Sequence, residues 1–402
     1  CPSSQVWDSK VTDDRDVIRR HALGSFRDML QASAKSVAML AYLNNDSSTK
    51  TSPNENYGRE LLELHTVGIE AGYTEREMRD SALVFTGWTY DKTTRLFSFR
   101  SDWHWTGRLS VLGWASANAS VTSGQAVGES YLNYLATHPM TARRIARKLA
   151  VRFVSDHPPQ ALIDRLTDVY LTTHGDVPRM IVAIAESPEF WGRDAVGSKI
   201  KSPFELTASA LRVTGGEIIE PRAILQWINR MGQPLYAYQA PTGYPDRAEA
   251  WVNTGSLLNR MNFGLQLAAN RVKGVSLDLP ALNGGREPAS REEALRTYAA
   301  LLMPGRDLTA TLKQLTPMVA DPGLAKRVDQ AAPKEAAKAA KKGDPNEDLL
   351  DSVPEMATQM PRSVKVRGML GDEPKPPVDK RPPTSLEQVV GVILGSPEFQ
   401  RR

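Results

Sequence analysis

The amino-acid sequence predicts a mainly α protein, a bundle-like array of many helices with one small β-hairpin near residues 86–99. Three observations predict this fold class. Helix-opening signals recur along the chain, apolar residues at helical spacing fill long stretches, and strand-like alternation appears mainly in TGWTYDKTTRLFSF, residues 86–99. The alternating run fits one hairpin, so helices are expected to form the rest of the fold.

Four segments open with a serine or threonine that is followed three residues later by glutamate. They are Ser-Pro-Asn-Glu at 52–55, Thr-Glu-Arg-Glu at 74–77, Ser-Pro-Phe-Glu at 202–205 and Thr-Ser-Leu-Glu at 384–387. This capping-box pattern marks a helix start, and proline is compatible with the first helical position. Gly68 and Gly87 are expected to end the first two helices. Apolar spacing predicts further helices over 22–43, 139–154, 160–173, 177–186, 222–231 and 255–271.

Composition and pattern divide the chain into four regions. Residues 1–200 form an N-terminal helical region that carries the NENYGRELLELHT helix and the aromatic hairpin, and residues 201–332 form a second helical region. From 333 to 383 the composition shifts to Lys, Ala, Pro and Glu, which is typical of an exposed excursion or linker. Residues 384–402 are expected to form a terminal helix that packs back on the core.

Two segments of the chain end alike. AIAESPEFW at 183–191 and VILGSPEFQRR at 392–402 are each an apolar helix followed by Ser-Pro-Glu-Phe. Two copies so far apart do not make a solenoid repeat. They indicate either related helical units or a shared way of docking a helix end.

The charge balance argues against a general polyanion-binding role. The 402 residues carry 50 Lys and Arg against 46 Asp and Glu, a formal net charge of +4, so no nucleic acid partner is expected. One predicted helix is strongly basic, but acidic residues elsewhere favour a solvated or internally paired face over nucleic acid binding. Its basic residues are Arg143, Arg144, Arg147, Lys148 and Arg152.

Other functional classes are excluded by what the sequence lacks. Apolar runs such as VVGVIL at 389–394 are far shorter than the roughly 18 residues of a membrane span, so the chain is not expected to cross a bilayer. The single cysteine, Cys1, allows no internal disulfide, and it fits either the lipid-bearing residue of a processed lipoprotein or a fragment boundary. The sequence shows no phosphate loop, nucleophile elbow, dinucleotide fingerprint or Cys/His zinc spacing. We therefore expect no cofactor and no metal site.

The segment NENYGRELLELHT is the strongest candidate site. On a helix, Asn56, Arg59, Glu60 and Glu63 fall within one narrow sector, and leucines spread around the rest. His65 points roughly away from the two glutamates, which disfavours a Glu/His metal site because ligand pairs share a helix face at i,i+4. The sector is either a solvated face with Arg59 and Glu63 paired, or a buried polar network. In such a network a carboxyl needs a partner or a raised pKa.

Aromatic residues supply candidate ligand contacts in two places. Four of the eight tryptophans lie between 88 and 114, and Trp103 and Trp105 are the pair expected to be exposed. Such rings either stack on sugars and other planar ligands or form the hydrophobic cover of the hairpin. The loop MGQPLYAYQAPTGYPD, residues 231–246, is long enough to line a pocket and carries Tyr236 and Tyr244.

Several motifs together resemble one bacterial family. They are HALGSFRDML, PNENYGRELLELHTVGI, GYTEREMRDSALVFTGW, HPMTARRIARKLAVRFVSD, SPEFW, KSPFE, MGQPLY and PTGYPD, in order within residues 15–270, with SPEFQRR at the end. The family is the one catalogued as domain of unknown function 1800. The resemblance implies an exported bacterial protein, periplasmic or extracellular, without an established activity, and a family N-terminal part that is missing from these residues. Where the family tends to show His-Asp-x-Gly, this sequence has His104-Trp105-Thr106-Gly107, which weakens the case for a His–Asp pair.

Two functions follow as hypotheses. We favour a binding or assembly subunit, whose aromatic hairpin and 333–383 region contact a protein partner or an extracellular polymer. The alternative is a hydrolase of an extracellular polysaccharide, with Glu60 and Glu63 as acid and base and Arg59 orienting them. We expect the polar residues of the 54–63 helix to gather near the 231–246 loop, with His65 at the edge. The expected ligand-binding residues are Asn54, Asn56, His65, Trp103, Trp105, Tyr236 and Tyr244.

Overall fold

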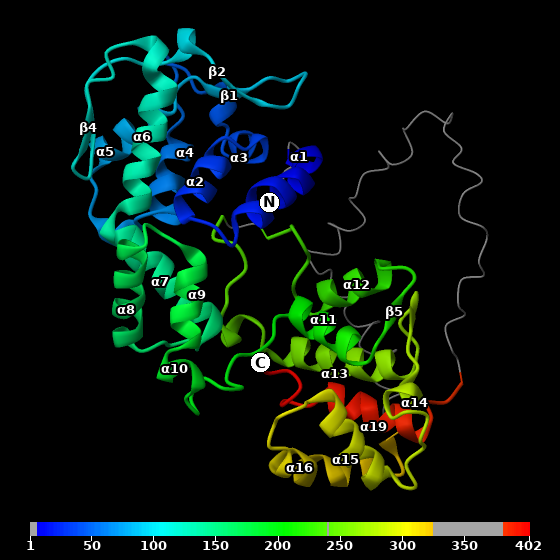
Figure 1. The fold of residues 1–402 in the computed structure, drawn as a ribbon. Helices are drawn as coiled ribbons and strands as arrows, with labels where there is room; N and C mark the ends of the chain where they lie inside the picture. The colour runs from blue at the N-terminus through cyan, green and yellow to red at the C-terminus, as the bar shows by residue number, and fades with distance from the viewer. Residues whose placement is uncertain (1–5, 239–240, 325–380) are drawn as a thin grey trace, which may run out of the picture. The chain divides into compact units, whose positions relative to one another are not determined.

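A computed structural model describes residues 6–238, 241–324 and 381–402 of the chain (Figure 1). The chain divides into two compact units. Unit 1 consists of residues 1–199 and 236–247, and unit 2 consists of residues 200–235 and 248–402. The mainly α fold is confirmed. Most of the 333–383 region lies outside the described residues.

Unit 1 contains helices and two short hairpins, whose strands lie at its edge (Figure 1). Its α-helices are α1 (Trp7–Thr12), α2 (Phe26–Ala34), α3 (Val37–Tyr42), α4 (Glu55–Glu60), α5 (Glu75–Val84), α6 (Gly124–Thr137), α7 (Pro139–Phe153), α8 (Gln160–Thr172), α9 (Val177–Ala185) and α10 (Pro188–Trp191). Two stretches, Asp13–Arg19 and Leu61–His65, are π-helical. The strands are β1 (Trp88–Tyr90), β2 (Phe97–Phe99), β3 (Leu109–Val111) and β4 (Trp114–Ser116).

The core of unit 1 joins α4, α5 and α6 to the first hairpin. Leu61, Leu62, Phe85, Trp88 and Tyr131 are fully buried in it. Phe85 packs edge-on against Trp88, with ring centroids 5.2 Å apart. The predicted hairpin is confirmed, because β1 and β2 pair antiparallel in the register Trp88 to Phe99. Trp88 is therefore part of the core, as expected for a hairpin with an apolar cover.

A second hairpin, β3–β4, was not predicted from the sequence. Its turn residues Leu112 and Gly113 both have positive φ, 49° and 90°, which is the geometry of a type I′ turn. Leucine rarely takes this conformation, so the turn carries no local signal. Tertiary contacts hold it instead: Glu77 accepts the Leu112 N–H at 2.9 Å, and the Tyr134 hydroxyl donates to the Leu112 carbonyl.

Unit 2 is also helical. Its elements are α11 (Pro203–Val213), α12 (Arg222–Arg230), α13 (Thr254–Ala268), α14 (Leu279–Leu282), α15 (Arg291–Leu302), α16 (Thr309–Ala320), α19 (Ser385–Leu394) and the strand pair β5 (Glu217–Ile218) and β6 (Val275–Ser276). Helix α19 packs against α13 on one side and α15 and α16 on the other (Figure 1). Every residue of α19 from Glu387 to Leu394 is consequently buried.

Three of the four expected capping boxes are present, and one is wrong. Thr74, Ser202 and Thr384 each exchange both hydrogen bonds with the glutamate three residues on. The helix expected from Ser52 instead begins at Glu55 and is capped by Asn54. The reason is a tight turn in which Ser52 and Thr49 exchange backbone hydrogen bonds, so the chain at Ser52 is not helical.

In the described part of the chain, none of the helices has the length and apolar character needed to cross a membrane.

Candidate functional site

The candidate segment changes from α-helix to π-helix within its own length. Helix α4 ends at Glu60, and Leu61–His65 continues it as a π-helix. Beyond the π-helix, the Thr66 hydroxyl donates to the Leu61 carbonyl at 2.7 Å, and the Gly68 N–H donates to the Leu62 carbonyl at 2.8 Å. Short π-helical turns occur frequently at functional sites, because they displace side chains from the regular helical register.

Asn54 stabilises the start of this segment. Its side-chain oxygen accepts the Asn56 N–H at 2.9 Å, and its amide donates to the carbonyls of Leu43 and Asn44 at 3.2 and 2.7 Å. These three bonds use the amide group of Asn54 for capping. Asn56 itself is exposed at the helix start.

Glu60 and Glu63 lie in different electrostatic environments. Glu60 is half-buried, and within the described structure its Oε2 has no hydrogen-bond partner. Burial raises the pKa of Glu60, and the neighbouring Glu63 raises it further, while Arg59 opposes the shift. Glu63 lies 3.8 Å from the Arg59 guanidinium and is hydrogen-bonded by Tyr73. Burial and the neighbouring carboxylate therefore favour the protonated form of Glu60.

Two tyrosines border the carboxyl pair. Burial and the charge of Glu63 raise the pKa of Tyr73 to about 12, so Tyr73 is a neutral hydrogen-bond donor to Glu63 at physiological pH. Burial, followed by the charge of Glu60, also raises the pKa of Tyr42. Both shifts have the same physical origin, a carboxylate beside a hydroxyl that is shielded from water.

Arg59 is not the centre of a buried ion-pair network. Its side chain is 46% exposed, and it lies 4.0 Å from Glu55 and 3.8 Å from Glu63. Exposed pairs at such distances contribute about 0–1 kcal/mol. The stability of unit 1 therefore depends little on the charges of this group, although the Glu60 carboxylate is costly to keep ionised.

His65 lies apart from the glutamates, in a basic environment. Burial lowers the pKa of His65 to about 4, and Lys148 and Arg144 lower it further through their charges. Arg144 caps the end of the π-helix, because its Nε and Nη2 both donate to the Leu64 carbonyl at 3.3 Å. His65 is thus a neutral imidazole in the folded protein.

We expect acid to destabilise unit 1 through His65. Its folded pKa of about 4 lies below its unfolded value of 6.5, so the unfolded state binds the extra proton as pH falls from 6.5 to 4. The stability that neutral His65 contributes is present above pH 6.5 and is lost over that window, by up to about 3 kcal/mol. Urea unfolding at pH 7 and pH 4.5 should show His65→Gln losing less stability than the wild type. The matched control is His157→Gln, at an exposed histidine, which should follow the wild type; a wild-type pH dependence in His65→Gln would contradict the prediction.

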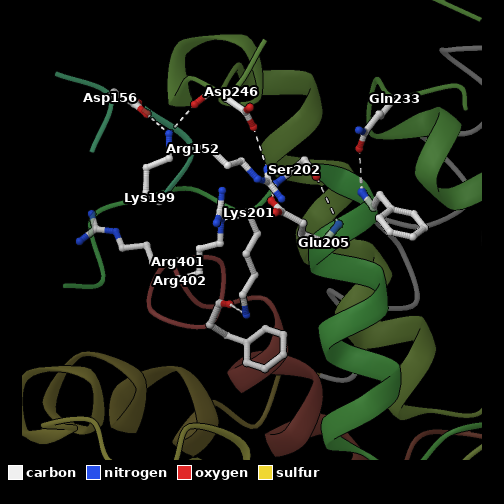
Figure 2. Close-up of polar contacts among 12 residues, drawn as sticks. Arg152, Asp156, Lys199, Lys201, Ser202, Glu205, Gln233, Asp246, Arg401 and Arg402 are labelled. Carbon is white, nitrogen blue, oxygen red and sulfur yellow. Dashed lines mark hydrogen bonds and ion pairs between the residues drawn. The ribbon is translucent and has the colours of Figure 1, made fainter. Parts of the chain in front are cut away.

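Residues 236–247 belong to unit 1 and are fixed to it through Asp246 (Figure 2). The Asp246 carboxylate accepts from Arg152 Nη1 at 2.7 Å. Lys199, which is 3% exposed, donates to the Asp246 carbonyl and to the Asp156 carboxylate. These bonds hold the C-terminal end of the segment.

The segment presents three tyrosines. Tyr236 is 55% exposed, and Lys10 Nζ lies 5.5 Å from its ring centroid. Its φ of 62° is unusual for a bulky residue and costs of order 1–3 kcal/mol, which surrounding contacts must offset. Tyr238 and Tyr244 pack together with ring centroids 4.5 Å apart, and burial raises the pKa of Tyr244 to about 12.

The structure gives only part of the expected gathering of residues. The charge of Lys148 contributes to lowering the pKa of His65. The charge of Asp246, in the 236–247 segment, in turn opposes the lowering of the Lys148 pKa by burial. Lys148 therefore lies near both His65 and this segment. Proximity of the Glu60–Glu63 pair to that segment stays a prediction.

Trp103 and Trp105 are both half-buried. The Arg100 guanidinium lies over Trp103, 4.4 Å from its ring centroid. Trp105 packs against Gly107 so closely that a Cβ there would lie 2.3 Å from the indole. Trp103 is therefore covered by Arg100, which is itself bonded to Asp102, and neither tryptophan of the pair expected to be exposed is fully so.

His104, at the point where the sequence departs from the family pattern, is a buried structural residue. Its Nδ1 lies 2.9 Å from the Thr86 carbonyl, and its Nε2 lies 2.9 Å from Asn118 Oδ1. The Asn118 amide donates to the Trp105 carbonyl at 2.7 Å, which fixes its orientation. An asparagine therefore occupies the position opposite Nε2 where a carboxylate would complete a His–Asp pair.

Sequence reasoning missed a cluster that joins two distant motifs in unit 2 (Figure 2). Lys201, of the KSPFE motif, donates to the Phe399 carbonyl at 2.6 Å and lies 4.1 Å from the Phe399 ring centroid. Arg260, which is fully buried, donates to the Lys201 carbonyl at 2.9 Å. Glu205 lies 3.4 Å from Arg402 Nε. The sequence held one signal for this cluster: the glutamate of KSPFE and the arginines of SPEFQRR carry opposite charges.

The basic helix α7 is largely paired within the unit. Arg143 donates to Asp164 at 2.8 Å, Arg152 donates to Asp246 and Arg144 caps Leu64. Arg147 and Lys148 are exposed. Across the described residues, no three His, Cys, Asp or Glu side chains are grouped so that they could hold a metal ion.

Comparison with known proteins gives one match. A family described as "Protein of unknown function (DUF1800)" matches residues 2–401. Neither a curated protein nor a solved structure matches the chain.

Proposed function

The chain belongs to the DUF1800 family, and from that premise we propose that it is an exported bacterial protein that binds an extracellular polymer through unit 1. Export and a periplasmic or extracellular location are inferred from the family resemblance. The observation that carries the proposal is the tyrosine segment 236–247, which is anchored at Asp246 and leaves Tyr236 55% exposed.

The chemistry of this segment suits a carbohydrate polymer. A tyrosine ring stacks its apolar face on a sugar while its hydroxyl stays hydrated. Tyr236 lies beside Lys10, and Tyr238 and Tyr244 form a second aromatic surface in the same segment. An anchored segment also loses less conformational freedom on binding than a free loop does, which favours affinity.

We expect Tyr236→Ala to weaken polymer binding about fivefold, because one stacked ring contributes about 1 kcal/mol. Tyr236→Ala combined with Tyr244→Ala should weaken it further. The measurement is affinity gel electrophoresis of the 402-residue chain in gels that contain a panel of soluble bacterial and plant polysaccharides. Phe204→Ala, at a 48% exposed aromatic residue of unit 2, is the matched control and should migrate as the wild type does. Wild-type retardation in the double variant, or no retardation of the wild type by any polymer, would refute the proposal.

A second function is favoured by the Glu60–Glu63 pair. A hydrolase of polysaccharides needs one protonated and one ionised carboxyl. The raised pKa of Glu60 and the Arg59 and Tyr73 partners of Glu63 support that division of roles. In this reading Glu60 is the general acid, Glu63 is the base and Arg59 orients Glu63.

A further inference from the structure

The two Ser-Pro-Glu-Phe segments follow their helices in a similar way, although Pro188–Trp191 forms the short helix α10 and residues 397–400 form a turn. We call Ser187–Trp191 the first SPEF segment and Ser396–Gln400 the second. Each follows a helix whose buried face has the same spacing: Met180, Ile184 and Ser187 in the first case, and Val389, Ile393 and Ser396 in the second.

The hydrogen bond at the entry to each segment repeats as well. The Ser187 N–H donates to the Ile184 carbonyl at 3.0 Å, and the Ser396 N–H donates to the Ile393 carbonyl at 3.0 Å. The last side chain of each segment folds back to the end of its helix, where the two acceptor carbonyls are one position apart. Trp191 Nε1 donates to the Ala185 carbonyl at 2.6 Å, and Gln400 Nε2 donates to the Gly395 carbonyl at 2.9 Å.

The second SPEF segment is covered by an extended stretch of unit 2. Ile200 and Arg401 form an antiparallel bridge, and the Lys201 N–H donates to the Gln400 carbonyl at 2.8 Å. The Lys201 side chain donates to the Phe399 carbonyl and lies over the Phe399 ring. This cover leaves Phe399 2% and Gln400 5% exposed.

The first SPEF segment has a free outer face. Trp191 is 69% exposed, and Val182, one turn before the helix end, is 53% exposed. Helix α9 packs on α7 and α8 through its opposite face. Glu186 is exposed beside Trp191, while Glu189 is paired with Arg165 at 2.6 Å. Exposed tryptophans are enriched at protein–protein contacts, and the nearby Glu186 adds a negative charge.

We propose that the first SPEF segment docks an extended stretch of a partner protein that carries a lysine, in the manner of Ile200 and Lys201 on the second segment. The lysine would donate to the Phe190 carbonyl and lie against the aromatic pair of Phe190 and Trp191, whose centroids are 5.1 Å apart.

An extended occupant fits this face better than a helix does. In unit 2, α13 approaches α19 closely at Gly391, where a Cβ would lie 2.9 Å from the Leu265 backbone. The equivalent position in α9 is Val182, whose side chain prevents such a close helix crossing. The edge at Trp191 and Gly192 stays accessible to a strand-like segment.

The experiment uses a labelled synthetic peptide, GSKIKSPF, which copies residues 197–204 and serves as the lysine-bearing probe. Fluorescence anisotropy follows its binding to the 402-residue chain. The informative variant is Trp191→Gln, because glutamine occurs at the equivalent position 400 and caps its helix there. Circular dichroism should show an unchanged fold for this variant. Ile69→Ala, at a 72% exposed residue of unit 1, is the matched control.

We expect saturable binding to the wild type and to Ile69→Ala, and binding at least about tenfold weaker to Trp191→Gln. A peptide with glutamine in place of the second lysine should bind comparably weakly. Equal binding by Trp191→Gln, equal binding of the glutamine peptide, or no binding to the wild type would overturn the proposal. Sedimentation velocity tests a second copy as the occupant: a dimer that Trp191→Gln converts to monomer would also overturn it.

Discussion

Glu60→Gln and Glu63→Gln are each expected to reduce polysaccharide hydrolysis roughly a thousandfold if the carboxyl pair is catalytic, because general acid and base steps contribute about 10²–10⁴ each. Glutamine keeps the shape of the side chain but cannot transfer the proton. Folding should be almost unaffected. Burial raises the pKa of Glu60, so ionised Glu60 costs stability above that pKa, and its replacement at pH 7 should leave the free energy of unfolding equal or higher.

Glu63→Gln should lower stability by no more than about 1 kcal/mol, since it removes an ion pair with an Arg59 side chain that is 46% exposed. The measurements are reducing-end release from a polysaccharide library and thermal unfolding of each variant. Glu75→Gln, at an exposed glutamate of α5, is the matched control and should keep full activity. A wild type that is inactive on every polymer, or variants that retain turnover, would refute the hydrolase and leave polymer binding to be judged by the tyrosine variants.

Gly58→Ala is expected to destabilise unit 1 by about 1–3 kcal/mol or more. Gly58 lies where α4 crosses α5, and a Cβ there would lie 2.6 Å from the Ala82 backbone nitrogen. Backbone cannot rotate away as a side chain can, so the helices must separate. Their separation would also weaken the bond from the Ser81 hydroxyl to the Gly58 carbonyl, 3.3 Å in length.

Urea unfolding of Gly58→Ala beside Gly255→Ala tests this packing. Gly255 lies in the first turn of α13, and a Cβ there meets only Asn253 Oδ1, at 3.6 Å. Alanine is intrinsically the better helix former, so Gly255→Ala should be neutral or slightly stabilising. Equal stability of the two variants would show that the α4–α5 crossing tolerates a methyl group.

The local chemistry of the sequence determined the fold class and most of the helix starts. Serine or threonine with glutamate three residues on identified the helices that begin after Thr74, Ser202 and Thr384, because both partners of each capping bond lie within one turn. The aromatic alternation around Trp88 identified the first hairpin, because alternation of period two is the pattern of a strand and a short connection brings Trp88 opposite Phe99. Ser52 was misassigned because its backbone bonds to Thr49, on the other side of the motif.

The order of the motifs determined the family, since the match over residues 2–401 agrees with the resemblance read from the sequence. Helical spacing also predicted that Glu60 and Glu63 share one face of the helix. It could not predict that their electrostatic environments differ, because that difference depends on Tyr73 and on the burial of Glu60 by other elements.

Only the tertiary structure decided the properties that depend on contacts between distant residues. The low pKa of His65 comes first from its burial in the fold and then from the charges of Lys148 and Arg144 on another helix. The difference between the two SPEF segments requires Lys201, which lies almost 200 residues from Phe399 and covers one copy. Short-range signals encode hydrogen bonds within a few residues, whereas burial and charge are set by whichever segments the fold brings together, so no local pattern around Trp191 or Phe399 distinguishes the exposed copy from the covered one.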